Sequence, residues 1–421
     1  MSSEWVQLTI GDLIKSSEAI IQTGPFGSQL HKHDYVDSGV PVIPTEAIGR
    51  GQILGIEVPQ VGPSKAKELE RHRLEVGDIL FARRGAQATG LSAIIDQRYV
   101  GAICGTGALL LRTDSKRVLP HFLALYLSSE FAFDWLRNHA VGAVMPNLNT
   151  GIIKALPLIL PSISEQRELS IFLGALDDRI TFLRETNATL EAIAQALFKS
   201  WFIDFDPVHA KQQGSAPEGM DEATAALFPG SFEESELGLV PKGWQPQRLE
   251  SFIELAYGKA LKSTDRIPGN VPVYGSGGIT GYHNESLTNG PSVIVGRKGT
   301  VGSLYWEDLP FFPIDTVFYV RSAAPMTYCF YLLRTLGLAD MNTDAAVPGL
   351  NRNNVYRLPV ALPMGDVLKA FDGVTKVIRE SIFRNQQQAQ TLATLRDTLL
   401  PRLISGQLRL PEAGAMAAEA A

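Results

Sequence analysis

Apolar side chains recur along one stretch of the sequence at alternating steps of four and three residues, from Leu169 to Trp201. This spacing is typical of a helix with one apolar face, and its persistence over several heptads indicates a coiled coil. A long helix is therefore predicted here. Its core positions are Leu173, Leu176, Ile180, Leu183, Leu190 and Leu197.

A second, weaker seam follows when the first is shifted by 202 residues, the separation between Leu169 and Phe371. It is weaker because Thr375 and Arg396 stand at seam positions. Two such helices in one chain bury their seams most simply against each other. At about 1.5 Å per residue, each helix is roughly 55 Å long, which predicts a rod. The core positions of the second helix are Ile378, Ile382, Leu392 and Leu399.

Each seam also carries an asparagine in or near its middle, Asn187 in the first and Asn385 in the second. A polar residue in a coiled-coil core fixes the register of the helices at some cost in stability. Alternatively, both asparagines lie exposed at a loose crossing of the helices. The sequence leaves these two interpretations open.

Ahead of each predicted helix, short runs of Val, Ile, Phe and Tyr are broken by Gly and Pro. Examples are VPVI at 40–43, DILFARRG at 78–85, VPVYGSGG at 271–278 and PSVIVGRKG at 291–299. Such runs are typical of short strands joined by irregular loops. An α+β fold is therefore predicted, with two mostly β domains that contain some α/β elements, each followed by a long helix.

The two halves of the chain repeat each other. ILFARRGA at 79–86 matches VIVGRKGT at 293–300, and VMPNLNTGIIKALPLILP at 144–161 matches AVPGLNRNNVYRLPVALP at 346–363. The offset shrinks from 214 to 202 residues between these matches, so the first copy has longer loops. A shared framework with different loops is expected of a duplicated scaffold that presents two binding surfaces, although neutral drift of the loops gives the same pattern.

Composition excludes several classes of protein. The 421 residues are 45% hydrophobic and 19% charged, which suits two or three globular domains and excludes wholesale disorder. Cys104 and Cys329 are far apart and outside any metal-binding spacing, so neither a disulfide framework nor a zinc finger is expected. The first residues lack the pattern of a signal peptide, and no apolar run reaches the length of a membrane helix. We expect a cytoplasmic protein with no membrane partner.

The net charge of -6 is unevenly distributed. Residues 161–240 contain 5 Lys and Arg against 14 Asp and Glu, which leaves the flanking regions free to form basic faces. An acidic total therefore does not exclude a polyanionic partner. Within this acidic region, residues 207–243 are rich in Pro, Gly, Ser and acids, and they are interpreted as a linker.

Motifs of catalysis are missing. The sequence has no GxxxxGK[ST], GxSxG or HExxH, and no (N/D)PP(Y/F) of the kind that amino-methylating enzymes use. YGSGGITGY at 274–282 lacks GxGxxG spacing and favours a turn over a nucleotide-binding loop. His31 and His33 favour a solvated loop over a metal site, and Asp204 and Asp206 favour a helix end over a nuclease site. We expect no enzyme activity, no cofactor and no metal.

Basic residues at the repeated strand ends are candidates for DNA binding. Arg83 and Arg84 in the first copy, and Arg297 and Lys298 in the second, are each followed by a glycine. Such a pair places two long donors on a loop whose backbone can approach a phosphate, and Arg can also bind guanine through two hydrogen bonds. A solvated strand end is the alternative. Further candidates nearby are Gln87, Thr89, Lys259, Lys262 and His283.

The order of these parts resembles the specificity (S) subunit, or HsdS, of Type I restriction-modification systems. The resemblance covers essentially the whole chain apart from its C-terminal tail. It is carried by TGPFGSQL, PNLNTGIIKALPLILPSISEQRELSIFLGALDDRI, LEAIAQALFKSWFIDFDPV and LLPRLISGQL. The second copy keeps only the skeleton of the conserved central region, since GDVLKAF replaces its EQRE.

The resemblance implies a non-catalytic subunit that binds double-stranded DNA. Two target recognition domains would each read one half of a bipartite, asymmetric site, and two helices would pack as an antiparallel coiled coil between them. One methylation (M) subunit would dock on each half, and restriction (R) subunits would join them. A rod of roughly 55 Å corresponds to on the order of 16 base pairs, which suits domain centres about one duplex turn apart. A coiled-coil scaffold or adaptor with duplicated β domains and no DNA reading is the alternative.

These considerations divide the chain into six expected segments. They are target recognition domain 1 at 1–157, conserved spacer helix 1 at 158–206, the linker at 207–243, target recognition domain 2 at 244–363, conserved spacer helix 2 at 364–410, and a disordered tail at 411–421.

Overall fold

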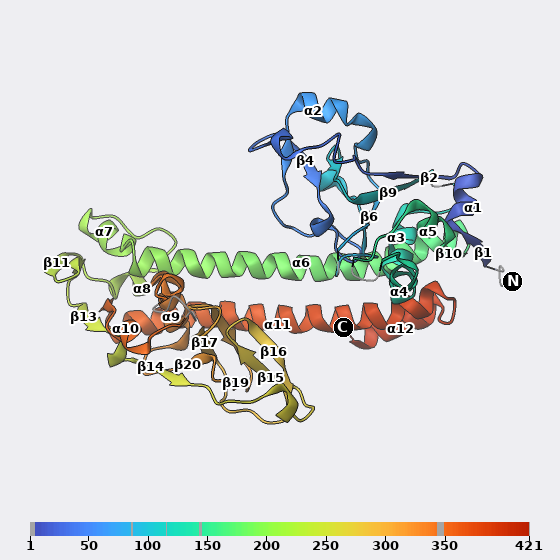
Figure 1. Ribbon diagram of the computed structural model, residues 1–421. Helices are drawn as coiled ribbons and strands as arrows, with labels where there is room; N and C mark the ends of the chain where they lie inside the picture. Colours follow the sequence, from blue (N-terminus) through green and yellow to red (C-terminus); the bar gives the residue numbers. More distant parts are fainter. Residues whose placement is uncertain (1–4, 86, 115, 143–144, 343–348, 421) are drawn as a thin grey trace. The chain divides into compact units, whose positions relative to one another are not determined.

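The computed structural model describes residues 5–85, 87–114, 116–142, 145–342 and 349–420 (Figure 1). It divides into two compact units. Unit 1 contains Met1–Phe182 and Gln388–Ala421, and unit 2 contains Leu183–Gln387. Each unit combines one mostly β domain with part of each of two long helices, α6 (Ile163–Phe202) and α11 (Gly365–Ile404). The predicted α+β fold with two repeated β domains and two long helices is confirmed.

The centre of unit 1 is a four-stranded antiparallel sheet in the order β2-β9-β6-β7. In β6, Ile79 and Phe81 belong to the core beneath the helices, whereas Leu80 and Ala82 belong to a separate core on the other face. Side chains alternate between the faces of a strand, so a strand buried on both faces reads as a continuous apolar run. The strands are β2 (Ala19–Thr23), β9 (Ala108–Thr113), β6 (Ile79–Ala82) and β7 (Ser92–Ile94).

A second sheet of unit 1 has the order β3-β5-β4-β8, and β1 pairs separately with β10. The β1–β10 pair joins the start of the chain to the residues just before α6. The remaining elements of this domain are β3 (Tyr35–Val36), β5 (Gln60–Val61), β4 (Val40–Ile43), β8 (Ile103–Cys104), β1 (Val6–Thr9), β10 (Pro157–Leu160), α1 (Ile10–Lys15), α2 (Pro63–Glu68), α3 (Pro120–Ser128), α4 (Glu130–His139) and α5 (Thr150–Ala155).

Unit 2 repeats the strand order of the main sheet, with one strand fewer in the smaller sheet. Its main sheet runs β14-β20-β17-β18, its smaller sheet runs β16-β15-β19, and β13 pairs with β21 as β1 does with β10. The parallel pair β15–β19 corresponds to the parallel pair β4–β8. The elements are β13 (Gln245–Arg248), β14 (Ile253–Tyr257), β15 (Val271–Gly275), β16 (Gly278–His283), β17 (Ser292–Gly296), β18 (Leu304–Glu307), β19 (Phe312–Pro313), β20 (Val317–Ser322), β21 (Pro359–Leu362), α9 (Met326–Thr335) and α10 (Arg352–Tyr356).

The segment predicted as a linker contains short elements of its own. These are α7 (Asp206–Gln212), α8 (Glu222–Ala226), β11 (Phe232–Ser235) and β12 (Gly238–Pro241). Val208 and Phe228 are buried, and the Phe228 ring meets Trp201 of α6 edge-on, with ring centroids 5.1 Å apart. Aromatic burial of this kind anchors the segment to unit 2.

The long helices pair in antiparallel fashion within each unit; in Figure 1, α6 is green and α11 is orange to red. In unit 1, Arg396 of α11 forms an ion pair with Asp177 of α6. In unit 2, Asn385 bonds Asn187, and Arg379 bonds Glu191, six residues earlier in α11 and four residues later in α6. Contacts that advance along one helix as they retreat along the other define antiparallel packing, as the family resemblance implied.

The predicted seam positions face inward. Leu173, Ile180, Leu183, Ile382, Leu392 and Leu399 are buried, and Leu176, Leu190, Leu197 and Ile378 are half-buried. Thr375, which departs from the apolar pattern, is fully buried, and its hydroxyl donates to the carbonyl of Phe371 at 2.8 Å. That bond satisfies the hydroxyl within its own helix, so Thr375 can be buried among apolar side chains.

The two asparagines form a cross-helix pair. Asn385 Nδ2 donates to Asn187 Oδ1 at 2.9 Å, and Asn187 Nδ2 donates to the carbonyl of Ile382 at 3.2 Å. Both side chains are half-buried. Of the two interpretations left open by the sequence, the structure therefore supports the one in which a polar pair fixes register.

The C-terminal segment differs from the expectation of disorder, because it forms α12 (Leu410–Ala420). Ala413 is fully buried, and Leu410 and Met416 pack on the core of unit 1. Alanine is the strongest helix former, and its small side chain allows close docking, so low complexity did not mean disorder here. Gly406, at φ +75°, turns the chain between α11 and α12, and its backbone lies against the ring of Trp5.

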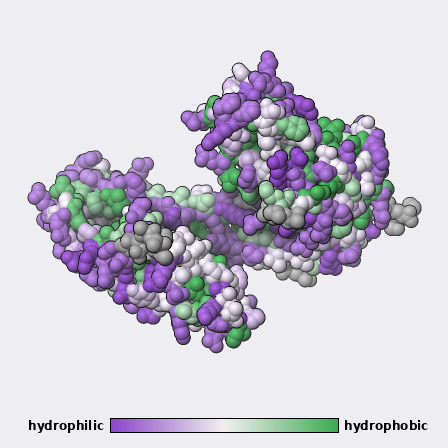
Figure 2. Space-filling model, in the orientation of Figure 1, coloured by the Kyte–Doolittle hydropathy of each residue, from purple (hydrophilic) through white to green (hydrophobic). Residues whose placement is uncertain are grey.

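The surface seen in Figure 2 is mostly hydrophilic, with hydrophobic residues in scattered patches. This agrees with apolar seams and strands that lie inside each unit. No helix in the described part of the chain has both the length and the apolar character needed to cross a membrane.

The asparagine pair yields a double-mutant test. Asn385→Leu removes the donor to Asn187 Oδ1, and leaving that oxygen unpaired should lower the free energy of unfolding by about 1 kcal/mol. Replacing both residues by leucine removes both polar groups and should recover most of the loss. Melting temperatures of the single and double variants measure this. Equal, additive losses would show that the two amides do not act as a pair.

Candidate nucleic-acid interface

In both units, the strand that carries the basic residues ends against a loop from the far end of the same domain. In unit 1, the Leu148 N–H donates to the Arg83 carbonyl at 3.0 Å, and the backbones of Arg84 and Asn147 form an isolated antiparallel β-bridge. In unit 2, the Leu350 N–H donates to the Arg297 carbonyl at 2.8 Å. In the same unit, the backbones of Lys298 and Gly349 form an isolated antiparallel β-bridge. Both leucines are buried, so each loop is held by an apolar anchor.

The residue after each leucine is an asparagine that caps the next helix. Asn149 Oδ1 accepts the N–H of Ile152 at 2.9 Å at the start of α5, and Asn351 Oδ1 accepts the N–H of Asn353 at 2.9 Å at the start of α10. A capping side chain satisfies one of the unpaired N–H groups at a helix start. The repeated Leu-Asn pair therefore builds the same arrangement twice, which we call the crossing: the contact of Arg83 and Arg84 with Asn147 and Leu148 in unit 1, and of Arg297 and Lys298 with Gly349 and Leu350 in unit 2.

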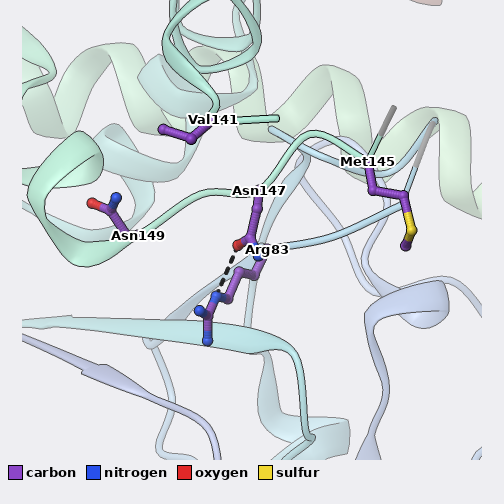
Figure 3. A pocket seen from close by; sticks show the side chains of 5 residues that line it. All are labelled: Arg83, Val141, Met145, Asn147 and Asn149. Carbon is purple, nitrogen blue, oxygen red and sulfur yellow. Dashed lines mark hydrogen bonds between the residues drawn. The ribbon is translucent and has the colours of Figure 1, made fainter. Parts of the chain in front are cut away.

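A shallow pocket of about 350 Å³ lies at the crossing in unit 1 (Figure 3). Arg83 Nε donates to Asn147 Oδ1 at 2.9 Å and to the carbonyl of Leu148 at 3.1 Å. Among the described residues these bonds engage Nε alone, so the terminal amino groups of the guanidinium can bind a ligand. Val141, Met145 and Asn149 complete the lining.

A pocket of about 360 Å³ occupies the equivalent place in unit 2. The half-exposed ring of Tyr257 contacts two guanidinium groups, and the Cζ atoms of Arg297 and Arg352 lie 5.2 and 4.9 Å from its centroid. Arg297 Nη2 also donates to the carbonyl of Asp315 at 2.7 Å. The exposed Lys298 adds a third cation to the lining.

The electrostatics of the unit 2 pocket favour an anion. Cation–π contacts orient Arg297 and Arg352 without neutralising them, and no carboxylate belongs to the described lining of this pocket. Planar guanidinium groups bind phosphate through paired hydrogen bonds. The half-exposed Tyr257 ring beside these groups adds an aromatic surface that a base or sugar can contact.

Most of the other predicted DNA contacts are exposed. Arg84 and Gln87 lie on the loop after β6, and Lys259 and Lys262 lie on the loop after β14. The structure thus brings Arg83 to one pocket and the Arg297–Lys298 pair to the other.

Two of the predicted DNA contacts, Thr89 and His283, are buried in this structure. Thr89 is 1% exposed, and its hydroxyl lies 2.8 Å from the Gly85 carbonyl and 3.0 Å from that of Pro146. His283 is buried too, and its Nδ1 accepts the N–H of Ile267 at 3.0 Å. These bonds hold both side chains against neighbouring backbone segments.

Two observations concern metal ligands and the two thiols in the part of the chain that the structure describes. No cluster of three or more His, Cys, Asp or Glu residues there could hold a metal ion. Burial raises the pKa of the Cys104 thiol to about 12, and burial likewise raises the pKa of the Cys329 thiol to about 12. A thiol in such surroundings stays protonated and is a poor nucleophile.

Sequence reasoning missed Tyr257, Arg352 and the asparagines of the crossing. The strings that contain Asn147, Asn149 and Asn351 were identified as repeats but interpreted as framework. The signal available in the sequence was that the asparagine of the Leu-Asn pair recurs in both halves of the chain, as the basic pair does. Nothing in the sequence places Tyr257 beside two arginines, because that arrangement brings together three separate segments.

Known proteins with similar sequences identify the class. A family profile described as "Type I restriction modification DNA specificity domain" matches residues 2–192 and again residues 241–389. Because the two matches cover most of the chain, the chain belongs to this family of specificity subunits.

Individual relatives agree with this assignment. The specificity subunit of the Type I restriction enzyme HindI from Haemophilus influenzae is 24% identical over 96% of this chain and 100% of its own length. The MjaIX specificity subunit from Methanocaldococcus jannaschii is 24% identical over 70% of each chain. The crystal structure of a Type I S subunit from M. genitalium shares the fold, with a TM-score of 0.56 and 18% identity, over 95% of this chain and 96% of that one.

The raised thiol pKa values yield a labelling test. Below about pH 11, both thiols of the folded chain should stay protonated, so a thiol reagent at pH 8 should react with neither Cys104 nor Cys329 on the timescale of minutes. In denaturant, both thiols return to an ordinary pKa near 8.5 and should react rapidly. Mass spectrometry counts the labels, and fast labelling of the folded chain would contradict the burial described here.

Proposed function

We propose that this chain reads a bipartite, asymmetric sequence of double-stranded DNA, with one half-site recognised in each unit. The observation that carries the proposal is the pocket built twice on the same backbone crossing but lined differently. In unit 1, the lining joins Arg83 to Asn147 and Met145, whereas unit 2 has Tyr257 and Arg352. Equal frames with unlike linings suit two unlike half-sites.

Affinity and specificity would come from different groups. Arg297, Arg352 and Lys298 would neutralise phosphates, which would release counterions and make binding weaken with salt. Arg83 keeps its terminal amino groups for a guanine edge or a phosphate. Gln87, Arg84, Lys259 and Lys262 lie on exposed loops, where variable side chains can reach base edges without disturbing the core.

Catalysis would belong to partner subunits. The relatives named above are specificity subunits of restriction enzymes, and we infer that this chain is likewise the non-catalytic part of a methylating and cutting complex. Two M subunits and further R subunits would assemble on it, and it would act in the cytoplasm. A coiled-coil adaptor without DNA reading is not favoured, because the family profile matches both repeats.

Exposed apolar residues on the long helices support docking of M subunits. On α6, Ile171 and Phe182 in unit 1 are 67% and 57% exposed. On α11, Val374 and Val377 in unit 2 are also exposed. Large apolar side chains left on the outer surface of a helix mark a protein-binding surface when they cluster. We infer that these side chains take part in the surface of each unit on which one M subunit would dock.

A domain exchange tests modular reading. Residues 1–157 are replaced by the first domain of a family member with a different target, and the hybrid is expressed with its methylation subunits. Methylome sequencing should show one half-site changed and the other intact, because each domain would read independently. An unchanged target sequence would defeat the proposal.

The unit 2 pocket yields a salt-dependence test in the complex with methylation subunits. Arg297→Ala/Arg352→Ala should weaken DNA binding roughly 10- to 100-fold and reduce the slope of log affinity against log salt by about 2, one per lost phosphate contact. Arg321→Ala is a matched control, since Arg321 also stacks on a tyrosine of unit 2, at 5.2 Å, but lies outside the pocket. An equal loss of DNA affinity in both variants would show that the pocket is not part of the DNA interface.

A further inference from the structure

Ion pairs between the two long helices have the same polarity in both units. In unit 1, Asp177 of α6 binds Arg396 of α11. In unit 2, Glu191 of α6 binds Arg379 of α11, with 2.9 Å between Oε2 and Nη1. In both described pairs, α6 supplies the carboxylate and α11 supplies the guanidinium.

The pair in unit 2 is largely withdrawn from solvent. The Arg379 side chain is 9% exposed and lies over the rings of Trp306 and Phe330, at 4.7 and 5.3 Å. Glu191 also accepts a bond from Arg334 at 2.7 Å. The low local dielectric strengthens such a pair, and a charge left there without its partner would be costly.

The internal repeat reverses the charge at one helix position. Both α6 and α11 contain 40 residues, and a shift of 202 residues places Ile163–Phe202 on Gly365–Ile404. The same shift places Asp177 on Arg379. An acid on one helix thus corresponds to a base on the other, although both positions face the partner helix.

This reversal changes what each helix can pair with. If α6 packed in the same geometry on α6 of a second chain, Asp177 would take the place of Arg379 and face Glu191, twice by symmetry. If α11 packed on α11 of a second chain, Arg379 would face Arg396, also twice. Only α6 with α11 brings two pairs of opposite charge together. The apolar seams do not discriminate in this way, since both have heptad spacing.

We infer that Asp177, Glu191, Arg379 and Arg396 form a charge code that pairs α6 with α11 and disfavours pairing of either helix with its own kind in a second copy of the chain. Charged residues beside an apolar seam commonly set partner choice in coiled coils, through attraction in the wanted pair and repulsion in the unwanted one. The code thus favours pairing of α6 and α11 within one chain. It is independent of DNA reading.

The test uses full-length chains with two different affinity tags. One variant reverses α6, by Asp177→Arg/Glu191→Arg, and the other reverses α11, by Arg379→Glu/Arg396→Glu. Each alone has like charges facing across its helix pair. When the two variants are expressed together, α6 of each can pair with α11 of the other. The four charged positions are all basic in one variant and all acidic in the other, so both of these pairings between chains bring opposite charges together.

The expected result is a one-to-one complex of the two variants in native mass spectrometry, whereas two tagged wild-type chains stay separate. Each variant alone should melt several degrees below wild type. A matched control, Lys376→Glu/Arg384→Glu, makes the same change in net charge at exposed positions of α11 and should leave the chain monomeric with little change in melting temperature. If a variant is insoluble alone, recovery by its complement supports the code, and failure to recover overturns it.

A test within unit 1 avoids the aromatic surroundings of Arg379. Asp177→Arg and Arg396→Glu should each lower the melting temperature, and the combined exchange should restore it. The code is overturned if the reversed variants remain monomeric with wild-type melting temperatures. It is also overturned if each variant associates with its own copies as readily as with the complementary variant.

Discussion

Burial of the seams of α6 and α11 against each other is the interaction on which the rest of the structure depends. In unit 1, Leu169, Leu173 and Leu399 belong to the same core as the helices and strands of the β domain. In unit 2, Ala194, Phe198 and Phe371 do the same. In each unit, the core next to the helices includes residues of both α6 and α11, whereas the core on the other face of the main sheet consists of β-domain residues alone. Separating the helices would therefore expose apolar surface in both domains, and not only along the coiled coil.

Polar groups in and beside this seam serve specificity more than stability. The amide pair of Asn187 and Asn385 and the ion pairs at the helix faces contribute little compared with apolar burial, because desolvation offsets much of their attraction. What they determine is which helix pairs with which, and in what register. Such a division suits a chain made of two similar halves, for which mispairing is the nearest competing structure.

The duplicated crossing shows how one frame supports two binding surfaces. The buried leucine and the capping asparagine are retained in both units because backbone geometry requires them. The side chains around them differ, since they contribute little to folding. Unit 2 thereby acquires a cationic pocket around Tyr257, whereas unit 1 has a smaller charge and more apolar lining. Recognition can diverge without cost to the core.

The repeats, the two helices and their seam residues followed from the sequence alone, because heptad spacing and apolar strand runs are local patterns. The basic strand ends were found in the same way. Burial of Thr89 and His283, the contact of Tyr257 with Arg297 and Arg352, and the docking of α12 were decided only by tertiary structure. Each of these depends on which distant segment covers a residue or supplies its hydrogen-bond partner, and such long-range contacts leave no periodic trace in the sequence.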